Sequence, residues 1–258
     1  MRLSSFNIVS LVFGLAFLYL PILLVVVYSF NASKLVTVWG GFSGQWYLAL
    51  LSNKPLLEAA WVSLRIAFVS ALGAALFGTL AALALRRYRR FMGRGLFAFM
   101  LYAPLVLPEI MTGLSLLLLF VALDLDRGFW TLALAHMAFT IAFVALIVDA
   151  RLADLDPSFE EAARDLGATP LSAFMRVTLP MIAPAVAAGF LLAFTLSLDD
   201  LVIASFTSGP GATTLPMRLY GQMRLGVTPE INAASTVMIV AVTLIVIFVS
   251  WLGKRKAA

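Results

Sequence analysis

The chain has 258 residues, 62% of them hydrophobic, and a mean hydropathy of +1.02. This composition excludes an ordinary water-soluble domain, because water cannot be the main solvent of so apolar a chain. The net charge of +5 does not indicate nucleic-acid binding, because no basic patch with interleaved aromatic residues lies outside the hydrophobic segments and their flanks. The absence of cysteine excludes disulfides and thiolate metal sites.

Six apolar runs are each long enough to cross a bilayer as a helix, which takes about 20 residues. They cover residues 9–30, 64–85, 96–123, 129–147, 181–206 and 233–252. The runs are continuous, whereas the strands of a membrane β-barrel alternate between apolar and polar residues over about ten positions. The sequence therefore predicts an all-α membrane protein with six transmembrane helices.

The basic residues predict the orientation of these helices, because Lys and Arg are enriched in cytoplasmic loops. Twelve of the 18 fall on one side of the predicted topology: Arg2, Arg86, Arg87, Arg89, Arg90, Arg94, Arg151, Arg164, Arg176, Lys254, Arg255 and Lys256. We therefore expect both termini to be cytoplasmic, together with the polar segment between the fourth and fifth helices.

The first connection, residues 31–62, is expected on the outer side. Ser43 is a candidate N-cap of a short helix that places Trp46 and Tyr47 at the level of the lipid headgroups, where such aromatic residues are enriched. A surface helix lying on the membrane is favoured there over one that contacts substrate. In the second hydrophobic run, Gly73 and Gly78 favour close approach of a neighbouring helix, although such residues are common in any helical bundle.

The third run contains Pro104 and Pro108, followed by Glu109 at membrane depth. Proline leaves backbone carbonyl groups without their helical partners, so protein or a water-filled cavity must surround this point rather than lipid. The fourth run contains His136, the sole histidine, which fits a hydrogen-bonded packing residue better than a proton relay because no second histidine accompanies it.

Asp199 and Asp200 lie in the second half of the fifth run. Ionisable groups at this depth cost about 2.5–3.5 kcal/mol each, so they usually mark a substrate path or a buried pair. Adjacent residues of a helix point about 100° apart, and the two carboxylates are therefore expected to have different roles. We expect at least one of Glu109, Asp199 and Asp200 to line a path.

The segment 160–180 is a polar interruption that is expected to form two short helices. Ser158 and Glu161 have the spacing of a capping box, and Gly167 is placed to end the first helix in a left-handed conformation. Thr169 is the expected cap of the second helix, and Pro180 is expected to end it.

Motifs of the common enzyme classes are absent from the sequence. No phosphate-binding P-loop occurs, a zinc site of the HExxH kind is impossible with one histidine, and no GxSxG motif is present. A polytopic protein with internal acids and a structured loop is therefore expected to transport a solute, with its energy supplied elsewhere.

The loop resembles the EAA loop of permease subunits of type I ABC importers. In that pattern EAA is followed after three residues by Gly and, after nine more, by Ile, any residue, Leu and Pro; here the matching residues are Glu161, Ala162, Ala163, Gly167, Val177, Leu179 and Pro180, with Val177 in place of Ile. The resemblance implies the type I ABC importer (MetI-like) permease fold over residues 1–258 as a single transmembrane domain. It also implies that residues 151–180 form a cytoplasmic coupling loop that docks on a separate ATPase.

Three further segments, residues 28–43, 103–120 and 191–216, resemble the polyamine branch of that family, most closely the putrescine permeases. Glu109 stands where relatives often have Asp. The resemblance implies a bacterial inner-membrane permease that forms a heterodimer with a paralogous permease in membrane lipid. It further implies two ATPase subunits that carry ATP and Mg, a periplasmic polyamine-binding protein, and no catalytic site, metal or cofactor in this chain.

Putrescine has an ammonium group at each end of a butane chain, and a path for it would require carboxylates and aromatic faces. Glu109, Asp199 and Asp200 are the candidates for its acidic part. Spermidine remains an alternative substrate, as do iron and sulfate, although three internal acids without a matching base disfavour an anion. A proton-coupled secondary transporter that uses the acids and His136 is a further alternative, and a membrane enzyme is a more distant one.

Overall fold

The computed structural model describes residues 5–36, 38–88, 90–226 and 228–255. Within these ranges every regular element is a helix, and the one extended pairing is an isolated antiparallel bridge between Asn31 and Phe42. Arg2, Arg89 and Lys256, which contributed to the predicted orientation, lie outside the described residues. The expected all-α membrane fold is confirmed, whereas the positions of the termini relative to the membrane stay a prediction.

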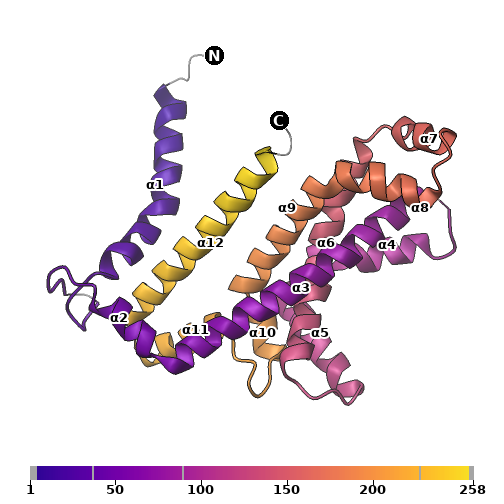
Figure 1. The fold of residues 1–258 in the computed structure, drawn as a ribbon. Helices are drawn as coiled ribbons and strands as arrows, with labels where there is room; N and C mark the ends of the chain where they lie inside the picture. Colours follow the sequence, from indigo (N-terminus) through magenta and orange to yellow (C-terminus); the bar gives the residue numbers. More distant parts are fainter. Residues whose placement is uncertain (1–4, 37, 89, 227, 256–258) are drawn as a thin grey trace. The chain divides into compact units, whose positions relative to one another are not determined.

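The helices follow one another in the order shown in Figure 1. They are α1 (Ser5–Tyr28), α2 (Gln45–Ser52), α3 (Lys54–Arg87), α4 (Arg94–Tyr102), the 3-10 turn η1 (Ala103–Leu105), α5 (Glu109–Ala122), α6 (Phe129–Ala153), α7 (Ser158–Asp165), α8 (Pro170–Ala173), the π-helical turn η2 (Phe174–Thr178), α9 (Leu179–Asp199), α10 (Val202–Thr207), α11 (Leu215–Leu225) and α12 (Pro229–Arg255).

The chain forms two compact units. The first consists of Met1–Glu58 together with Arg218–Ala258, and the second is Ala59–Met217. The expectation of a single permease domain over 1–258 stays a prediction.

In the first unit, α12 packs against α1 and α2. The loop between α1 and α2 is organised by the buried side chain of Asn31, whose amide group donates to the carbonyl of Val38 at 2.8 Å and accepts from the amide of Gly40 at 2.8 Å. Trp46 donates to the carbonyl of Asn31 at 2.7 Å, which ties α2 to this loop. Helix α2 forms as expected, but its N-cap is Gly44 rather than Ser43.

In the second unit, α6 packs extensively on α9, and small residues permit the close approach. Val144 of α6 lies between Gly78 of α3 and Gly189 of α9, where an added Cβ atom would come within 2.9 Å and 3.0 Å of its side chain, respectively. Gly73 is similarly covered by Met137 of α6. The small residues of the second hydrophobic run therefore lie at a packed seam.

Among the described residues, five helices are long and apolar enough to span a membrane, and a sixth span results if α4, η1 and α5 count together. This third span is not one helix, because its two halves meet at an angle of 118°. The break follows from Pro104 and Pro108, which cannot donate the backbone hydrogen bonds of a continuous helix.

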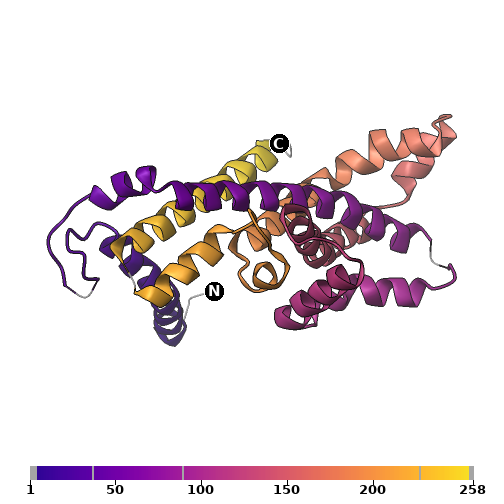
Figure 2. The ribbon, with the colours of Figure 1, turned by 90° about the horizontal axis from the view of Figure 1, so that it is seen from below.

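The fifth span also differs from the sequence expectation. Its helix α9 ends at Asp199, Asp200 is extended, and α10 then begins as a separate short helix (Figures 1 and 2). At its other end the span is longer than expected, because α8, η2 and α9 form one apolar helical run, Pro170–Asp199. Pro180 therefore does not end the second loop helix. The π-helical turn Phe174–Thr178 precedes it and lets the chain continue despite the missing proline N–H.

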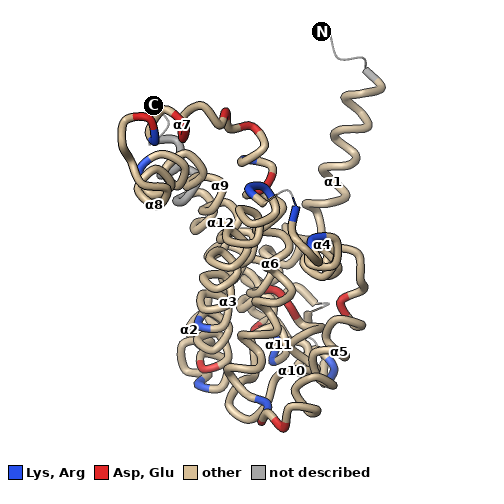
Figure 3. Tube along the Cα trace, turned by 90° about the vertical axis from the view of Figure 1, so that its right-hand side faces the viewer, with Lys and Arg blue, Asp and Glu red and all other residues tan. Residues whose placement is uncertain are grey.

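Charged residues of the second unit gather around α7 and α8 and the adjoining ends of α3 and α4, and again near the far end of α5 (Figure 3). Contacts place the loops at these two ends. Arg87 at the end of α3 pairs with Glu160 of α7, whereas at the other end the side chain of Ser63 accepts from the amide of Leu215 at 2.7 Å. Arg86, Arg87 and Arg94 therefore lie at the same end of the unit as the polar loop, as the charge distribution predicts.

Candidate functional site

The start of α7 is fixed by a side chain that the sequence reasoning did not select. Asp156 accepts a hydrogen bond from the amide of Ser158 at 2.9 Å, and the backbone and then the side chain of Ser158 hold the pKa of this carboxyl below its usual value. The expected capping box between Ser158 and Glu161 does not form, because Ser158 is already inside the helix and Pro157 takes the N-cap position. The side chain of Asp156 accepts from the amide of Ser158 and so takes the capping role that was expected of Ser158.

The end of α7 is as predicted. Gly167 has φ +90°, the left-handed conformation that glycine adopts without a Cβ penalty. Its amide donates to the carbonyl of Arg164 at 2.9 Å, and the amide of Ala168 donates to the carbonyl of Ala163 at 3.1 Å. These two bonds form a Schellman motif, which satisfies carbonyl groups at the helix end and turns the chain sharply.

The second loop helix begins as predicted. The hydroxyl of Thr169 accepts from the amide of Ser172 at 3.3 Å, and Pro170 occupies the first helical turn. Because the run from Pro170 continues into α9, this helix is joined directly to a transmembrane span. The loop and the span are thus parts of one continuous helical run.

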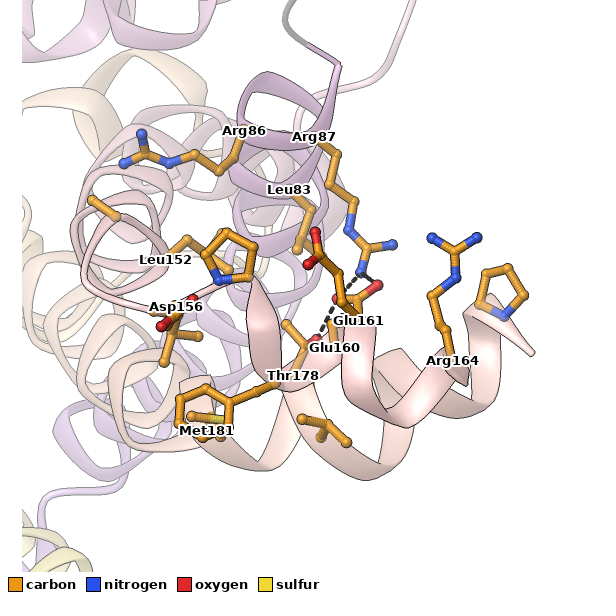
Figure 4. Close-up of a pocket in the computed structure, with 16 residues that line it drawn as sticks. Leu83, Arg86, Arg87, Leu152, Asp156, Glu160, Glu161, Arg164, Thr178 and Met181 are labelled. Atoms are coloured by element: carbon orange, nitrogen blue, oxygen red, sulfur yellow. Dashed lines mark hydrogen bonds and ion pairs between the residues drawn. The ribbon is translucent and has the colours of Figure 1, made fainter. Parts of the chain in front are cut away.

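The two adjacent glutamates of α7 have different surroundings. A guanidinium nitrogen of Arg87 donates to both carboxylate oxygens of Glu160, and the hydroxyl of Thr178 donates to the same carboxylate at 2.7 Å (Figure 4). The guanidinium of Arg87 also lies 5.6 Å from the ring centroid of Phe174. Glu161 is exposed, and its side chain has no hydrogen bond or ion pair within the described part of the chain.

A cavity of about 590 Å³ lies between α7 and the ends of the neighbouring helices (Figure 4). Its lining includes Leu83 at the end of α3, Leu152 at the end of α6, Phe159 of α7 and Met181 of α9. Arg86, another lining residue, is held by Asp149 of α6 at 3.2 Å. This hollow lies on the side of α7 toward α3 and α6, whereas α7 packs against η2 and α8.

The residues of the EAA pattern lie on the accessible part of this loop. Ala162, Gly167 and Pro180 are exposed, while Ala163 and Leu179 are half-buried. The loop also exposes large apolar side chains at Phe159, Leu166, Leu171 and Met175, of which Leu166 is 90% exposed. An exposed apolar surface on an ordered loop is typical of a site that binds another protein.

The three candidate path acids lie around the break between α9 and α10. Glu109 is the first residue of α5 and is exposed, as is Asp199 at the end of α9. Helix α5 packs against α10, where Gly113 leaves room for Phe206 and Ile203. Two of the three carboxylates are therefore accessible beside the broken helices.

The Asp200 carboxylate is buried, with 6% of its side chain exposed. It accepts from the amides of Ile203 at 3.2 Å and Ala204 at 2.7 Å, so it caps α10. The sequence predicts different roles for the two aspartates on the assumption that both lie in one continuous helix. In the structure their surroundings differ because the helix ends between them.

His136 lies beside the Asp200 carboxylate inside the unit. Its Nε2 atom is 3.2 Å from an Asp200 oxygen, close enough for an ion pair although outside hydrogen-bonding geometry. Its Nδ1 atom shares a hydrogen bond of 2.6 Å with Ser197, whose hydroxyl accepts from Ser70 at 3.0 Å. The arrangement is a polar contact chain through α3, α6 and α9. In the described ranges no group of three or more His, Asp or Glu residues could hold a metal ion.

Sequence reasoning missed Arg87, Glu160 and Thr178. The pattern of the loop drew attention to Glu161, and nothing in a single sequence indicates that residue 160 meets a residue 73 positions away. Arg87 was assigned only to the charge bias of the membrane flanks. The burial of Thr178 appears only in the structure, so the sequence offers no signal for its role.

These features define a multi-pass helical membrane protein with an ordered, exposed loop at one end of its second unit and broken helices beside accessible acids. The model of a family described as "Binding-protein-dependent transport system inner membrane component" matches residues 74–255, and the chain belongs to this family. It is therefore a multi-pass inner-membrane transport component. A proton-coupled secondary transporter and a membrane enzyme are both disfavoured by this membership.

Two relatives and one solved structure agree with this assignment. The chain is 56% identical over 98% of its length, and 92% of the relative's, to the putrescine transport system permease protein PotI of Escherichia coli K12. It is 43% identical to the spermidine/putrescine transport system permease protein PotC of the same strain, covering 93% of this chain and 91% of the relative. A bacterial ABC transporter involved in importing the acidic polysaccharide alginate shares the fold, with a TM-score of 0.71, 19% identity, and coverage of 97% of this chain and 99% of that chain.

Proposed function

We propose that this chain is the permease subunit of an ATP-driven importer for a polyamine, with putrescine as the favoured substrate. The observation that carries the proposal is the 56% identity with a putrescine permease over nearly the whole chain. Spermidine is the second candidate, because the spermidine/putrescine permease is also 43% identical.

In this proposal the chain forms half of the path and pairs with a second, different permease. Two ATPase subunits hold ATP and Mg, and a periplasmic binding protein delivers the polyamine. The family description, which ties transport to a binding protein, supports the last of these partners. The chain itself carries no cofactor.

Residues 151–180 are proposed to couple the ATPase to the path. Glu161, Ala162 and Ala163 would enter the docking interface, Gly167 would set the bend, and Leu179 and Pro180 would join the loop to α9. The exposure of Ala162 supports close docking of a partner backbone, and the exposed Leu166 supports an apolar contact. The continuous helical run from Pro170 to Asp199 supports transmission into the membrane.

The acidic part of the path is proposed to comprise Glu109, Asp199 and Asp200. A diammonium ion loses hydration in the membrane, and carboxylates beside a break in the helices would replace part of it. The exposure of Glu109 and Asp199 supports direct contact with substrate. The buried Asp200 would instead act without touching substrate, through its negative charge and through the hydrogen bonds by which it positions α10.

The experiment is to purify the complex through this subunit, reconstitute it in lipid, and measure ATP hydrolysis with the binding protein empty, loaded with putrescine or loaded with spermidine. We expect an ATPase to co-purify and the putrescine-loaded protein to give the largest stimulation. Preferential stimulation by spermidine would replace the substrate assignment, and failure of any ATPase to co-purify would refute the importer proposal.

A further inference from the structure

The polar contacts of α7 with other helices run through a single side chain. Among the hydrogen bonds and ion pairs of the described residues, those that join a side chain of α7 to another helix all involve Glu160. Its partners are Arg87, the last residue of α3, and Thr178, the last residue of η2. A residue next to the EAA pattern therefore links α7 both to η2, which follows it closely in the sequence, and to the distant α3.

Close packing joins α7 to η2 and α8, so the hydrogen bond to Thr178 adds to a packed contact. The cavity of about 590 Å³ separates much of α7 from the ends of α3 and α6. Phe159, the large apolar residue at the start of α7, is 55% exposed, and Leu166 at its end is 90% exposed. Across the hollow, where close packing is absent, the contact of Glu160 with Arg87 joins α7 to α3.

Both partners of Glu160 are rigidly connected to transmembrane helices. Arg87 ends the 34-residue helix α3 and also lies over the ring of Phe174, so the contact closes a ring from α7 through α3 to η2. Thr178 is 92% buried and leads directly into α9. Ser70, at the middle of α3, donates to Ser197, near the other end of α9, at 3.0 Å. Ser197 lies two residues before Asp199. The two helices held by Glu160 are therefore also joined beside the candidate path.

We infer that Glu160 is a positioning residue for transport, which ties α7 to the ends of α3 and α9 so that displacement of the loop displaces both spans together. The inference rests on the proposed function, in which the loop docks on an ATPase. It assigns different roles to neighbouring residues: Glu161 faces the partner, whereas Glu160 holds the loop to the path. Loss of the link uncouples ATP hydrolysis from uptake without preventing docking.

The test uses the full reconstituted complex with the variants Glu160→Gln and Arg87→Gln, alone and together. Glu160→Gln keeps the size of the side chain and an acceptor for Thr178 but removes the charge that holds Arg87. Asp154→Asn is the matched control, because Asp154 is an exposed acid at the end of α6 without a hydrogen bond or ion pair in the described part of the chain. The readouts are co-purification of the ATPase, hydrolysis stimulated by loaded binding protein, and putrescine uptake.

We expect every variant to co-purify with the ATPase and to keep at least about half of the stimulated hydrolysis. The putrescine taken up per ATP hydrolysed should fall about tenfold in each single variant, which is a typical coupling effect. In the double variant, the putrescine taken up per ATP should be no lower than in the single variants, because both changes break the same contact. Arg87→Lys should recover part of the loss, since one ammonium group can still reach the carboxylate.

Three results would overturn the inference: an unchanged uptake per ATP in Glu160→Gln, a loss of ATPase co-purification in that variant, or additive losses in the double variant. The first would show that the contact has no role in coupling, and the second would show that Glu160 is needed for docking. The third would show that Glu160 and Arg87 act independently. Failure of the proposed function is distinguishable, because the wild-type complex would then show no stimulation with loaded binding protein.

Discussion

Two neighbouring carboxylates illustrate how the local backbone assigns a role to a residue. Asp199 ends a helix and is exposed, whereas Asp200 is extended and turns its side chain into the unit, where it meets two free amides and His136. A buried carboxylate is stable only where donors or a positive charge compensate the lost hydration. Asp200 has such partners, so neutralising Asp200 and neutralising Asp199 should have different effects on the protein.

We predict that Asp200→Asn lowers the free energy of unfolding by about 2 kcal/mol, because the neutral amide accepts more weakly from the first free amides of α10. Asp199→Asn should change stability by less than about 0.5 kcal/mol but reduce putrescine uptake. Denaturant unfolding of the purified chain and uptake into proteoliposomes give the two readouts. Equal stability losses, or undiminished uptake in Asp199→Asn, would contradict this division.

At the scale of the helix, α7 shows which local features a sequence predicts. Gly167 and Thr169 were identified correctly, because a left-handed turn and an N-cap each depend on residues within a few positions. Pro180 was misjudged, since a π-helical turn upstream accommodates it and proline alone does not reveal that turn. The break at Asp200 was missed for a related reason: its stabilising partners include His136, which lies on another helix.

The candidate site was predictable to a similar extent. The accessible residues of the EAA pattern were found because they form one contiguous motif. Glu160, Arg87 and Thr178 were not, because their proximity depends on how α3, α7 and η2 pack together. Six spans were counted correctly if the bent pair is one span, but the 118° angle between its halves depends on neighbours that hydropathy does not describe.

The bend after α7 leads to a prediction for Gly167→Val. The φ of +90° costs a residue with a Cβ about 1–2 kcal/mol, and no heavy atom lies within 4 Å of the added Cβ, so strain rather than crowding decides the outcome. The loop should rearrange, and hydrolysis should no longer respond to loaded binding protein although the chain still inserts into the membrane.

Gly93→Val is the matched control for this variant. Gly93 has φ +83° and equally open surroundings, but it lies in the turn before α4. The Gly93→Val variant should therefore have similar backbone strain, but its ATP hydrolysis should still respond to loaded binding protein. Gly167→Asn should behave close to wild type, because asparagine tolerates the left-handed conformation. Full stimulation in Gly167→Val would show that the bend is not needed for coupling.

At the scale of the whole molecule, the two ends of the second unit should face opposite sides of the membrane. One end carries α7 and the basic end of α3, joined by the contact of Glu160 with Arg87. The other carries the turn after α5 and the loop before α11, where Gly209 packs against the backbone of Arg127. The positive-inside tendency then places α7 in the cytoplasm.

The chain contains no cysteine, so the labelling of a single introduced cysteine can report this orientation without labelling of a native thiol in the chain. Ser158→Cys at the start of α7 and Asp126→Cys beyond α5 are both at exposed positions. In intact spheroplasts a membrane-impermeant maleimide should label Asp126→Cys and leave Ser158→Cys unmodified, and in inverted vesicles the pattern should reverse. Labelling of both from one side would refute opposite placement of the two ends. A complete inversion would place α7 outside the cell, out of reach of any cytoplasmic ATPase, and would remove the physical basis for coupling through this loop.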